Sequence, residues 1–447
     1  ESNLVSYPGL YFMKTIDGLS ATFPKYVLVQ DTSHFDVFVK ERADFLAKSK
    51  GDRTYPWRML MLSDQDIDLL SNRLVYLHAD EAKEDFSWVK PGKVAWDWWN
   101  AISLTGVDFE AGVNTDSYKY FVDFAAEYGI EYINLDEGWS NQFDLFDLKG
   151  DVNPVEIIEY ANSKGVGVFL WCVWHTLHRQ MPEILDQFEA WGVAGIKVDF
   201  MNRDDQEVVD FYHKLAKEAA KRKILINYHG AYKPTGLIRT YPNVINREAV
   251  MGLEYSKWSD RVSPGHDVTI PYLRALAGPM DFTPGAMRNA VYEDFRAIFS
   301  RPMSQGTRIH QLAMFVIYYA PLQMTADAPT DYENEPGYSE FMAKIPTTWD
   351  ESVALEGEIG KYVVLARRKG DIWYVAGMTD WEEREVSVDL IFLGKGNYTL
   401  KGFEDGPNAH LTATDYRTKT MNKVAASDTL NVVMKSGGGF VYQLSKQ

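Results

Sequence analysis

The chain has 447 residues, of which 46% are hydrophobic and 24% are charged, and its net charge is −17. This composition is typical of a soluble globular protein with two or three domains. The negative charge argues against nucleic acid as a partner, because a polyanion would be repelled, and no run of about 18 apolar residues predicts a membrane span. The single cysteine, Cys172, excludes an internal disulfide and a cysteine-rich zinc site.

Residues 1–90 contain few regular elements. Their strand-like segments, rich in β-branched and aromatic residues, are 26–29, 35–39 and 56–62. Residues 64–77 predict one short helix. The chain begins with Glu1 and shows no signal peptide, so we expect a processed or truncated end. Three strands are too few for a complete sheet domain, so this segment is expected to be the end of a larger β domain or an appendage to the next domain along the chain.

Between residues 93 and 327, short apolar strands alternate with amphipathic helices. The predicted strands are 94–99, 132–136, 167–171, 196–199, 224–227, 244–247, 280–282 and 322–324. The predicted helices are 114–128, 154–163, 181–191, 206–222 and 306–319. About eight such alternations are typical of a (β/α)8 TIM barrel. An open doubly wound sheet is the alternative, but no glycine-rich loop comes after the first strand.

From about residue 348 the helical periodicity ends and strand patterns separated by Gly, Asn and Asp begin. The predicted strands are 362–366, 372–377, 386–388, 398–400 and 439–444, which together indicate a C-terminal antiparallel β-sandwich. We therefore predict three domains: the end of an N-terminal β-sandwich with a linker helix at 1–90, a catalytic barrel at 91–345, and a β-sandwich at 346–447.

The strand 195–200 carries two opposite charges on one side. Side chains alternate along a strand, so Lys197 and Asp199 point the same way, into the barrel. A buried charge is costly unless it is paired or used, and the lysine would lower the pKa of the aspartate and keep it ionised. This pattern fits either the nucleophile of a covalent glycosidase or a structural ion pair in the core.

Polar and aromatic residues gather where the predicted strands end, which is where barrel enzymes carry their active sites. These residues include Asp97, Trp98, Asp136, Glu137, Trp171, His175, Asp199, His229, Glu248, Glu254 and Asp281. Any one of them has a structural explanation, such as a helix cap or a core tryptophan. Together, acids and aromatic rings without a basic patch favour a neutral sugar as the ligand.

Glycoside cleavage needs two carboxyl groups in different protonation states. Asp199, beside Lys197, is the better candidate for the ionised one. The aromatic residues that come after Glu254 would raise its pKa, as an acid catalyst requires. Glu248 and Glu137 are rivals that residue chemistry alone does not separate from Glu254.

At the level of motifs the chain resembles glycoside hydrolase family 97. The resemblance rests on an ordered set of segments: 87–93 (SWVKPGK), 96–99 (WDWW), 132–139 (YINLDEGW), 197–201 (KVDFM), 233–236 (KPTG), 239–243 (RTYPN) and 280–285 (MDFTPG). This family combines an N-terminal β-sandwich, a (β/α)8 barrel and a C-terminal β domain. It contains inverting α-glucosidases and retaining α-galactosidases. By this resemblance we expect residues 1–90 to be the end of the N-terminal domain, without most of its length.

The resemblance implies a mechanism and a cofactor. Inverting members have a base glutamate directly after the histidine that ends the fifth strand, where this chain has Gly230 after His229. The chain is similar instead to the retaining members, which makes Asp199 the nucleophile and Glu254 the acid/base. The family also binds Ca²⁺, through glutamates that match Glu248 and Glu254, and Glu1 is a third candidate ligand. Clustered carboxylates suit this hard cation on their own account.

We therefore predict a retaining exo-acting α-glycosidase, an α-galactosidase in the first place, that hydrolyses terminal α-galactosides. The expected substrate contacts are Lys197, Asp136, Glu137, Trp98, Trp171, His229 and Asp281. The alternatives are an inverting α-glucosidase of the same family and a non-catalytic carbohydrate-binding barrel, since a barrel does not fix function. By resemblance the protein is periplasmic or secreted from a bacterium, and its oligomeric state stays open.

Overall fold

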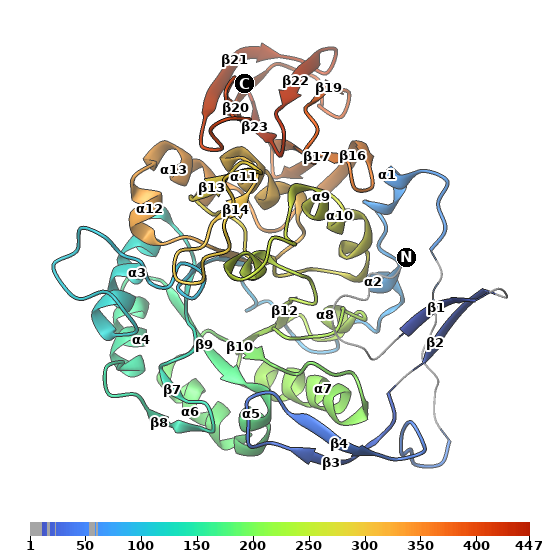
Figure 1. The fold of residues 1–447 in the computed structure, drawn as a ribbon, viewed down its shortest axis with the longest axis vertical. Coiled ribbons are helices and arrows are strands. Elements are labelled where there is room, and N and C mark those ends of the chain that lie inside the picture. Colours follow the sequence, from blue (N-terminus) through green and yellow to red (C-terminus); the bar gives the residue numbers. More distant parts are fainter. Residues whose placement is uncertain (1–10, 16–17, 23, 53–58, 60) are drawn as a thin grey trace.

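The computed structural model of this chain describes residues 11–15, 18–22, 24–52, 59 and 61–447. Its centre is a parallel sheet of seven strands that curls into a nearly closed barrel (Figure 1). In order around the sheet these are β12 (Val244–Arg247), β11 (Leu225–Tyr228), β10 (Gly195–Asp199), β9 (Gly167–Val173), β6 (Tyr132–Leu135), β5 (Gly92–Trp96) and β15 (Leu322–Thr325). Neighbours follow the chain order and β15 pairs with β5, which confirms the barrel over an open doubly wound sheet.

The strand predicted at 280–282 is wrong, because this segment joins no ladder. Pro279 and Pro284 flank it, and neither has a backbone N–H to donate to a neighbouring strand. The barrel is held together here by a side chain instead. Asn246 of β12 donates from Nδ2 to the carbonyl oxygen of Leu322 in β15 at 2.7 Å. The first strand also ends earlier than predicted, at Trp96, because the next residues turn.

Helices cover the outside of the barrel. The longer ones are α3 (Thr115–Tyr128), α4 (Pro154–Ser163), α5 (Trp174–Gln180), α6 (Glu183–Trp191), α7 (Gln206–Lys221), α11 (Arg308–Ile317) and α13 (Pro336–Lys344). The five predicted helices are confirmed, and α5 and α13 were not predicted. The short ones are α8 (Leu237–Thr240), η1 (Leu253–Lys257), α9 (Pro264–Asp267), α10 (Ile270–Leu273), η2 (Ala275–Ala277) and α12 (Pro329–Glu333). Among the described residues no helix is both long and apolar enough to cross a membrane.

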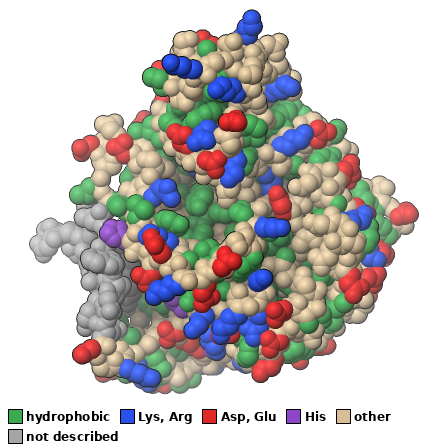
Figure 2. Space-filling view, turned by 180° about the vertical axis from the view of Figure 1, so that it is seen from behind, with side chains coloured by type: hydrophobic (Ala, Val, Ile, Leu, Met, Phe, Trp, Pro, Cys, Tyr) green, Lys and Arg blue, Asp and Glu red, His purple; other side chains and the backbone are tan. Residues whose placement is uncertain are grey.

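Two small two-stranded sheets interrupt the loops of the barrel. One is the antiparallel pair of β7 (Ser140–Asn141) and β8 (Asp144–Leu148), and the other is the parallel pair of β13 (Asn289–Ala290) and β14 (Ser304–Gln305). On the face shown in Figure 2, charged side chains of both signs are scattered, and hydrophobic side chains gather in a hollow near its middle.

The N-terminal part of the chain forms hairpins and short helices beside the barrel, and the hairpin of Tyr11–Thr15 and Gly18–Thr22 projects away from it (Figure 1). Its elements are β1 (Tyr11–Thr15), β2 (Gly18–Thr22), β3 (Val27–Asp31), β4 (Phe38–Arg42), α1 (Asp66–Leu69) and α2 (Leu74–His78). The single helix predicted at 64–77 is two helices, and the strand predicted at 56–62 falls largely outside the described residues. The second strand of β3–β4 starts at Phe38, later than predicted, because the residues before it form a loop over the barrel.

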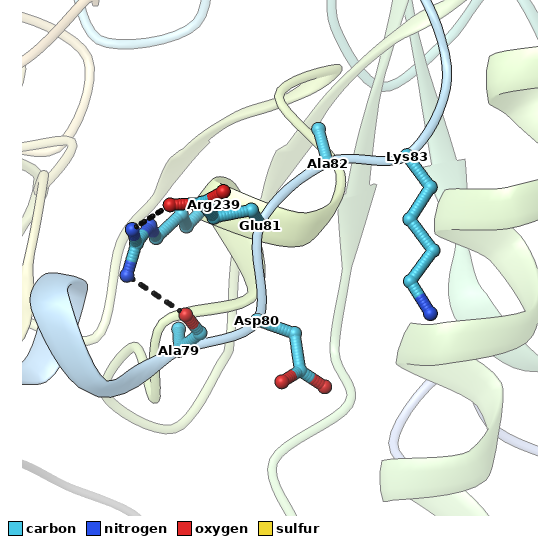
Figure 3. Close-up of a pocket in the computed structure, with 6 residues that line it drawn as sticks. All are labelled: Ala79, Asp80, Glu81, Ala82, Lys83 and Arg239. Carbon is cyan, nitrogen blue, oxygen red and sulfur yellow. Dashed lines mark hydrogen bonds and ion pairs between the residues drawn. The ribbon is translucent and has the colours of Figure 1, made fainter.

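The motif at residues 233–243 fixes the linker that comes after α2. Arg239 of α8 donates to the carbonyl oxygen of Ala79 at 3.0 Å and pairs with Glu81 at 2.6 Å. Figure 3 shows these side chains around a shallow surface pocket that is lined by the linker and Arg239. Gly236 allows the close approach, because a Cβ there would meet the Cβ of Ala79 at 2.4 Å. This pocket contains none of the predicted site residues, and its polar contacts hold the linker.

The C-terminal region is an antiparallel structure at one end of the molecule (Figure 1). A six-stranded sheet contains β16 (Glu351–Glu358), β17 (Tyr362–Lys369), β18 (Ile372–Thr379), β23 (Gly439–Lys446), β20 (Tyr398–Asp405) and β21 (Tyr416–Val424). A ribbon of β19 (Arg384–Asp389) and β22 (Thr429–Met434) packs on it around a separate apolar core. The predicted strands are confirmed. The sequence patterns did not predict β16, β21 and β22, of which β16 and β21 have no clean alternation of buried and exposed residues.

A buried carboxyl group joins this region to the barrel. Asp405 accepts from the Thr307 hydroxyl, which precedes α11, at 2.7 Å, and from the backbone N–H groups of Lys435 and Gly439. Burial raises the pKa of Asp405 to about 7, although these hydrogen bonds and nearby His310 oppose the shift. The folded state therefore holds a proton that an unfolded chain releases near its ordinary value of 3.8.

The sign of this shift predicts how stability depends on pH. Since the folded-state pKa is raised, the contribution of Asp405 to the free energy of unfolding should fall as the pH rises from about 4 to about 7. Across this pH range the melting temperature should fall more for the unmodified chain than for Asp405→Asn, because the asparagine cannot ionise. The control is Asp371→Asn at an exposed turn. Parallel curves for the chain and Asp405→Asn would contradict the assignment.

Candidate active site

The predicted site residues come together at the carboxyl ends of the barrel strands. Trp98 and Asp136 follow β5 and β6, Trp171 lies in β9, Lys197 and Asp199 lie in β10, His229 follows β11, Glu248 follows β12, Glu254 lies in η1, and Asp281 lies in the segment before α11. Parallel strands end at one rim of a barrel, which is why residues spread over about 180 positions meet there. Glu1 is outside the described residues.

The ion pair of Lys197 is with Asp136, and not with Asp199 as the sequence suggested. Its Nζ lies 2.8 Å from Asp136 Oδ2, 3.8 Å from Glu254 Oε1 and 4.4 Å from the centre of the Trp96 ring. Burial opposes the charge of the lysine, but Asp136, Glu254 and Asp199 outweigh it and raise the pKa of Lys197. The reason is geometric: across the barrel mouth, Asp136 at the end of β6, two strands away in the sheet, lies closer to the ammonium than Asp199 of its own strand.

Asp136 is the most fully hydrogen-bonded acid of the site. Its Oδ2 accepts from Trp96 Nε1 at 2.7 Å and from Asn134 Nδ2 at 3.0 Å, besides Lys197. Burial alone would raise its pKa, but Lys197 and these donors lower the pKa of Asp136 overall. Behind it, burial and the charge of Asp136 raise the pKa of Asp97 to about 7. The arrangement keeps Asp136 ionised and rigid, with little freedom left to move toward a ligand.

Asp199 is held by two donors that leave its carboxyl group directed at the mouth of the barrel. Its Oδ2 accepts from Trp171 Nε1 at 3.1 Å and its Oδ1 from the backbone N–H of Phe200 at 2.6 Å. Phe200 has a positive φ of 65°, as does Asn202 at 48°, so the chain turns sharply after the strand. Such strain in residues other than glycine clusters at functional sites.

Gly230 adjoins this carboxylate. Its φ is +51°, and a Cβ at this position would meet Asp199 Oδ1 at 2.9 Å, the N–H of Phe200 at 2.8 Å and Asn202 Oδ1 at 2.7 Å. The carboxylate of Asp199 therefore occupies the space that a side chain at position 230 would need. In this chain a glutamate at 230 and the observed placement of Asp199 exclude one another.

The tip of the β3–β4 hairpin reaches the same place, which the sequence did not indicate. Asp36 Oδ1 accepts from Asn202 Nδ2 at 2.7 Å, and the rings of Phe35 and Phe200 are 4.7 Å apart. Burial and the charge of Asp199 raise the pKa of Asp36, although Asn202 opposes the shift. The N-terminal segment thus helps to form the rim beside Asp199. No motif marks such a contact, because it joins segments that are far apart along the chain.

On the other side of the site, His229 lies among three acids. Its Nε2 is 2.6 Å from Asp281 Oδ2, and its Nδ1 is 3.7 Å from Glu254 Oε1 and 3.9 Å from Glu248 Oε1. Burial opposes protonation of the ring, as does Lys197, but the acids outweigh them and raise the pKa of His229 to about 9. Asp281, which also accepts from Asn227, orients the ring.

The two glutamates of this group are both disposed to hold protons. Burial raises the pKa of Glu248 to about 8, against the opposing charge of His229, and Glu254 and Asp199 add to the rise. Burial also raises the pKa of Glu254, against Lys197 and His229. The two side chains differ in how accessible their carboxyl oxygens are to a ligand. Glu248 Oε2 already accepts from the backbone N–H of Gly230 at 2.7 Å. Glu254 is therefore the member that remains available for proton transfer.

The remaining candidates lie at the edge of the site. Glu137 is solvent-exposed and hydrogen-bonds Gln142, and partial desolvation with the charges of Asp136 and Asp199 raises its pKa. Trp98 is half-buried, and its ring lies 6.0 Å from that of Trp96. Both can contact a ligand at the mouth of the barrel.

A cation fits the group of His229, Glu248 and Glu254. One ligand atom from each lies within 4.8 Å of the others. The charge of Glu254 contributes to the raised pKa of Glu248, and a bound cation would relieve this repulsion. Two carboxylates suit Ca²⁺, although a histidine nitrogen is a less usual ligand for it than oxygen.

Comparison with known proteins identifies the family. The glycoside hydrolase 97 family matches residues 98–250, and the family described as "Glycosyl-hydrolase 97 C-terminal, oligomerisation" matches residues 348–445. The chain is 44% identical to a "Retaining alpha-galactosidase" of Bacteroides thetaiotaomicron, over 99% of this chain and 68% of that relative. The chain belongs to glycoside hydrolase family 97. It is a member of a family of glycosidases, as the motifs indicated.

Two further relatives agree with this membership. A "Probable retaining alpha-galactosidase" of Streptomyces bingchenggensis is 31% identical over 88% of this chain and 58% of its own length. The solved structure of a family 97 enzyme in complex with acarbose, from Pseudoalteromonas sp. strain K8, has a TM-score of 0.83 and 30% identity, and covers all of this chain and 72% of that one. A variant of that enzyme was solved with panose, so structural neighbours bind carbohydrates.

A β-arabinopyranosidase has the same fold, with a TM-score of 0.76 at 24% identity. All these relatives are longer than this chain, and the two named α-galactosidases come from bacteria. At this identity the β-arabinopyranosidase supports the fold alone.

Proposed function

We propose that the protein is a retaining exo-acting α-galactosidase that hydrolyses terminal α-galactosides through a covalent glycosyl-enzyme. The observation that carries this proposal is the placement of Asp199 in the space that a side chain at position 230 would need. An inverting family member requires a base at that position, and this chain has none. The names of the relatives from Bacteroides and Streptomyces support the same conclusion.

In the first step Asp199 attacks the anomeric carbon while Glu254 protonates the leaving oxygen. Trp171 and the N–H of Phe200 keep the attacking carboxylate oriented until the substrate arrives. Burial, together with the charge of Asp199, raises the pKa of Glu254 against the opposing charges of Lys197 and His229. A raised pKa suits the proton donor that this step requires.

The second step reverses the role of Glu254. When Asp199 becomes an ester it loses its charge, and with it one of the causes that raise the pKa of Glu254. Lys197, 3.8 Å away, then favours the ionised form of that glutamate. The deprotonated Glu254 accepts a proton from the water that attacks the ester, and galactose leaves with its configuration retained.

The proposed substrate contacts follow from the position of the site side chains at the carboxyl ends of the barrel strands. Asp136, Glu137 and Asp281 offer carboxylate oxygens to sugar hydroxyls, Lys197 and His229 offer N–H donors, and Trp98 and Trp171 offer apolar rings. Acids that face hydroxyl groups recognise a neutral sugar without needing an anionic group on it. This is consistent with a net charge of −17 on the protein.

Calcium is the cation that we assign to Glu248 and Glu254, with His229 close by and Glu1 as a further candidate ligand. When bound, such an ion polarises nearby hydroxyl groups and compensates the repulsion between carboxylates. The residues that would hold it are also those whose pKa values are raised, so proton and cation compete for the site.

We also propose a division of the chain into domains and a cellular location for the enzyme. The division into segments 1–90, 91–345 and 346–447 stays a prediction, supported by the confinement of the barrel and sandwich sheets to the second and third ranges. By resemblance the enzyme acts in the periplasm of a bacterium or after secretion. Fractionation of the source cells, with the hydrolysis of a chromogenic α-galactoside as the assay, tests the location.

Replacement of the nucleophile provides the first test. Asp199→Ala should lose at least about 10³-fold in turnover of a chromogenic α-galactoside, because the covalent step has no other nucleophile. Azide or formate should restore part of the turnover by filling the space. The control, Asp210→Ala on the exposed face of α7, should keep full activity. Near-normal hydrolysis by Asp199→Ala would contradict the assignment, and no hydrolysis by the unmodified chain would favour a binding protein.

The stereochemical outcome provides the second test. Retaining pairs of carboxyl groups are about 5–5.5 Å apart, whereas inverting pairs leave about 6.5–9.5 Å for a water molecule. We expect α-galactose as the first-formed sugar in an NMR time course, before mutarotation. Early β-galactose would mean that another carboxylate activates water, and Glu137, exposed at the rim, would be the first one to replace.

Removal of the cation provides the third test. Chelation with EDTA should lower the melting temperature and the activity, and added Ca²⁺ should restore both, because a bound ion stabilises the folded state by mass action. Glu248→Gln should need more Ca²⁺ for the same effect. Metal analysis that finds no calcium, together with unchanged melting after EDTA, would remove the cation from the proposal.

A further inference from the structure

Three aromatic side chains form an exposed surface beside the site. The rings of Trp98, Trp258 and Phe299 lie within 5.9–6.4 Å of one another, and Trp258 and Phe299 are 48% and 58% exposed. We call these three residues the aromatic shelf. Exposed large apolar groups are individually common, but three that touch one another form a patch that suits a ligand.

The shelf is fixed from below by a buried cation. Lys257 Nζ donates to the backbone oxygens of Trp98 and Trp99, and it lies 4.4 Å from the Trp98 ring and 4.6 Å from the Phe299 ring. One ammonium group therefore connects the loop after β5, the helix η1 and the segment that carries Phe299. An ammonium group at such distances is attracted to the faces of aromatic rings. The rings are thereby held in place before any ligand binds.

The shelf is continuous with the reacting centre. Trp98 stacks on Trp96, with the rings at 20° to one another, and Trp96 donates to Asp136 inside the barrel. Trp258 directly follows η1, the short helix that carries Glu254, and its ring lies 5.1 Å from that of Tyr255. Trp258 therefore joins the shelf to the chain segment that supplies the acid/base.

We propose that the aromatic shelf binds the leaving-group sugar of the substrate, a hexopyranose whose apolar face stacks on Trp258 and Phe299. This rests on the proposed function, because an acid that protonates the glycosidic oxygen must lie on the side from which the leaving group departs. The position of Glu254 defines the side from which the leaving group departs. Trp258 comes about one helical turn after Glu254 in the chain. Stacking explains why the rings are exposed, aromatic and held in place, while Asp136 and Asp199 serve the galactose ring deeper in the barrel.

The test compares two substrates that differ only in the leaving group. One is α-galactosyl fluoride, whose leaving group is a single atom, and the other is an α-galactosyl-glucose disaccharide. Trp258→Ala and Phe299→Ala should each lower kcat/KM for the disaccharide by about 3- to 10-fold, which corresponds to the loss of one aromatic contact. With the fluoride, both variants should stay within about twofold of the unmodified chain. Trp258→Phe should recover most of the loss.

Tyr292→Ala is the matched control. This residue is 66% exposed on the same segment as Phe299, but its ring contacts Trp381 of the C-terminal region. It should affect neither substrate. Equal losses on both substrates, or no loss on the disaccharide, would overturn the shelf as a leaving-group site. A changed sedimentation coefficient with unchanged kinetics would do the same and would mark the shelf as a contact between copies. Failure of the unmodified chain to hydrolyse the fluoride would instead overturn the proposed function itself.

Discussion

The charge balance around Lys197 is the constraint on which the rest of the site depends. An ammonium group that is almost fully buried inside a barrel is tolerated only with a close partner, and Asp136 provides it at 2.8 Å. The pair sets the field in which the other groups ionise, since Lys197 also acts on Glu254 from 3.8 Å. With the Lys197 charge in place, several acids lie close together at the mouth of the barrel, and the pKa of Asp136 is lowered while that of Glu248 is raised. Removing it would leave Asp136 buried and unpaired.

A second constraint is steric. At Gly230 the backbone turns through a positive φ, and the absence of a Cβ leaves room for the carboxylate of Asp199. One missing side chain thereby links local backbone geometry to the proposed stereochemistry. The same region receives the tip of the β3–β4 hairpin, whose Asp36 holds Asn202. Residues far outside the barrel motifs thus take part in shaping the space next to the nucleophile.

Sequence patterns predicted the architecture well where apolar and polar residues recur with a regular period along the sequence. The strand at Gly195–Asp199 and the helix α7 have clear periods of two and 3.6 residues, and both are confirmed. The segment 280–282 has an apolar strand-like composition, but the prolines beside it prevent a ladder. The strand β21 was missed because it is mostly exposed, with no alternation to detect. Local pattern therefore fails where tertiary hydrogen bonding decides the backbone.

The sequence by itself determined the barrel, the terminal antiparallel region, and the gathering of acids at one rim, because strand polarity places successive strand ends together whatever the details of packing. It also carried the motifs of the family. Only the tertiary structure decided which charges pair: Lys197 lies nearer to Asp136, on a different strand end, than to Asp199 two residues along its own strand. It also showed that Trp258 and Phe299 meet above Lys257. Distances between side chains on different strands depend on the curvature and closure of the sheet, which no local pattern encodes.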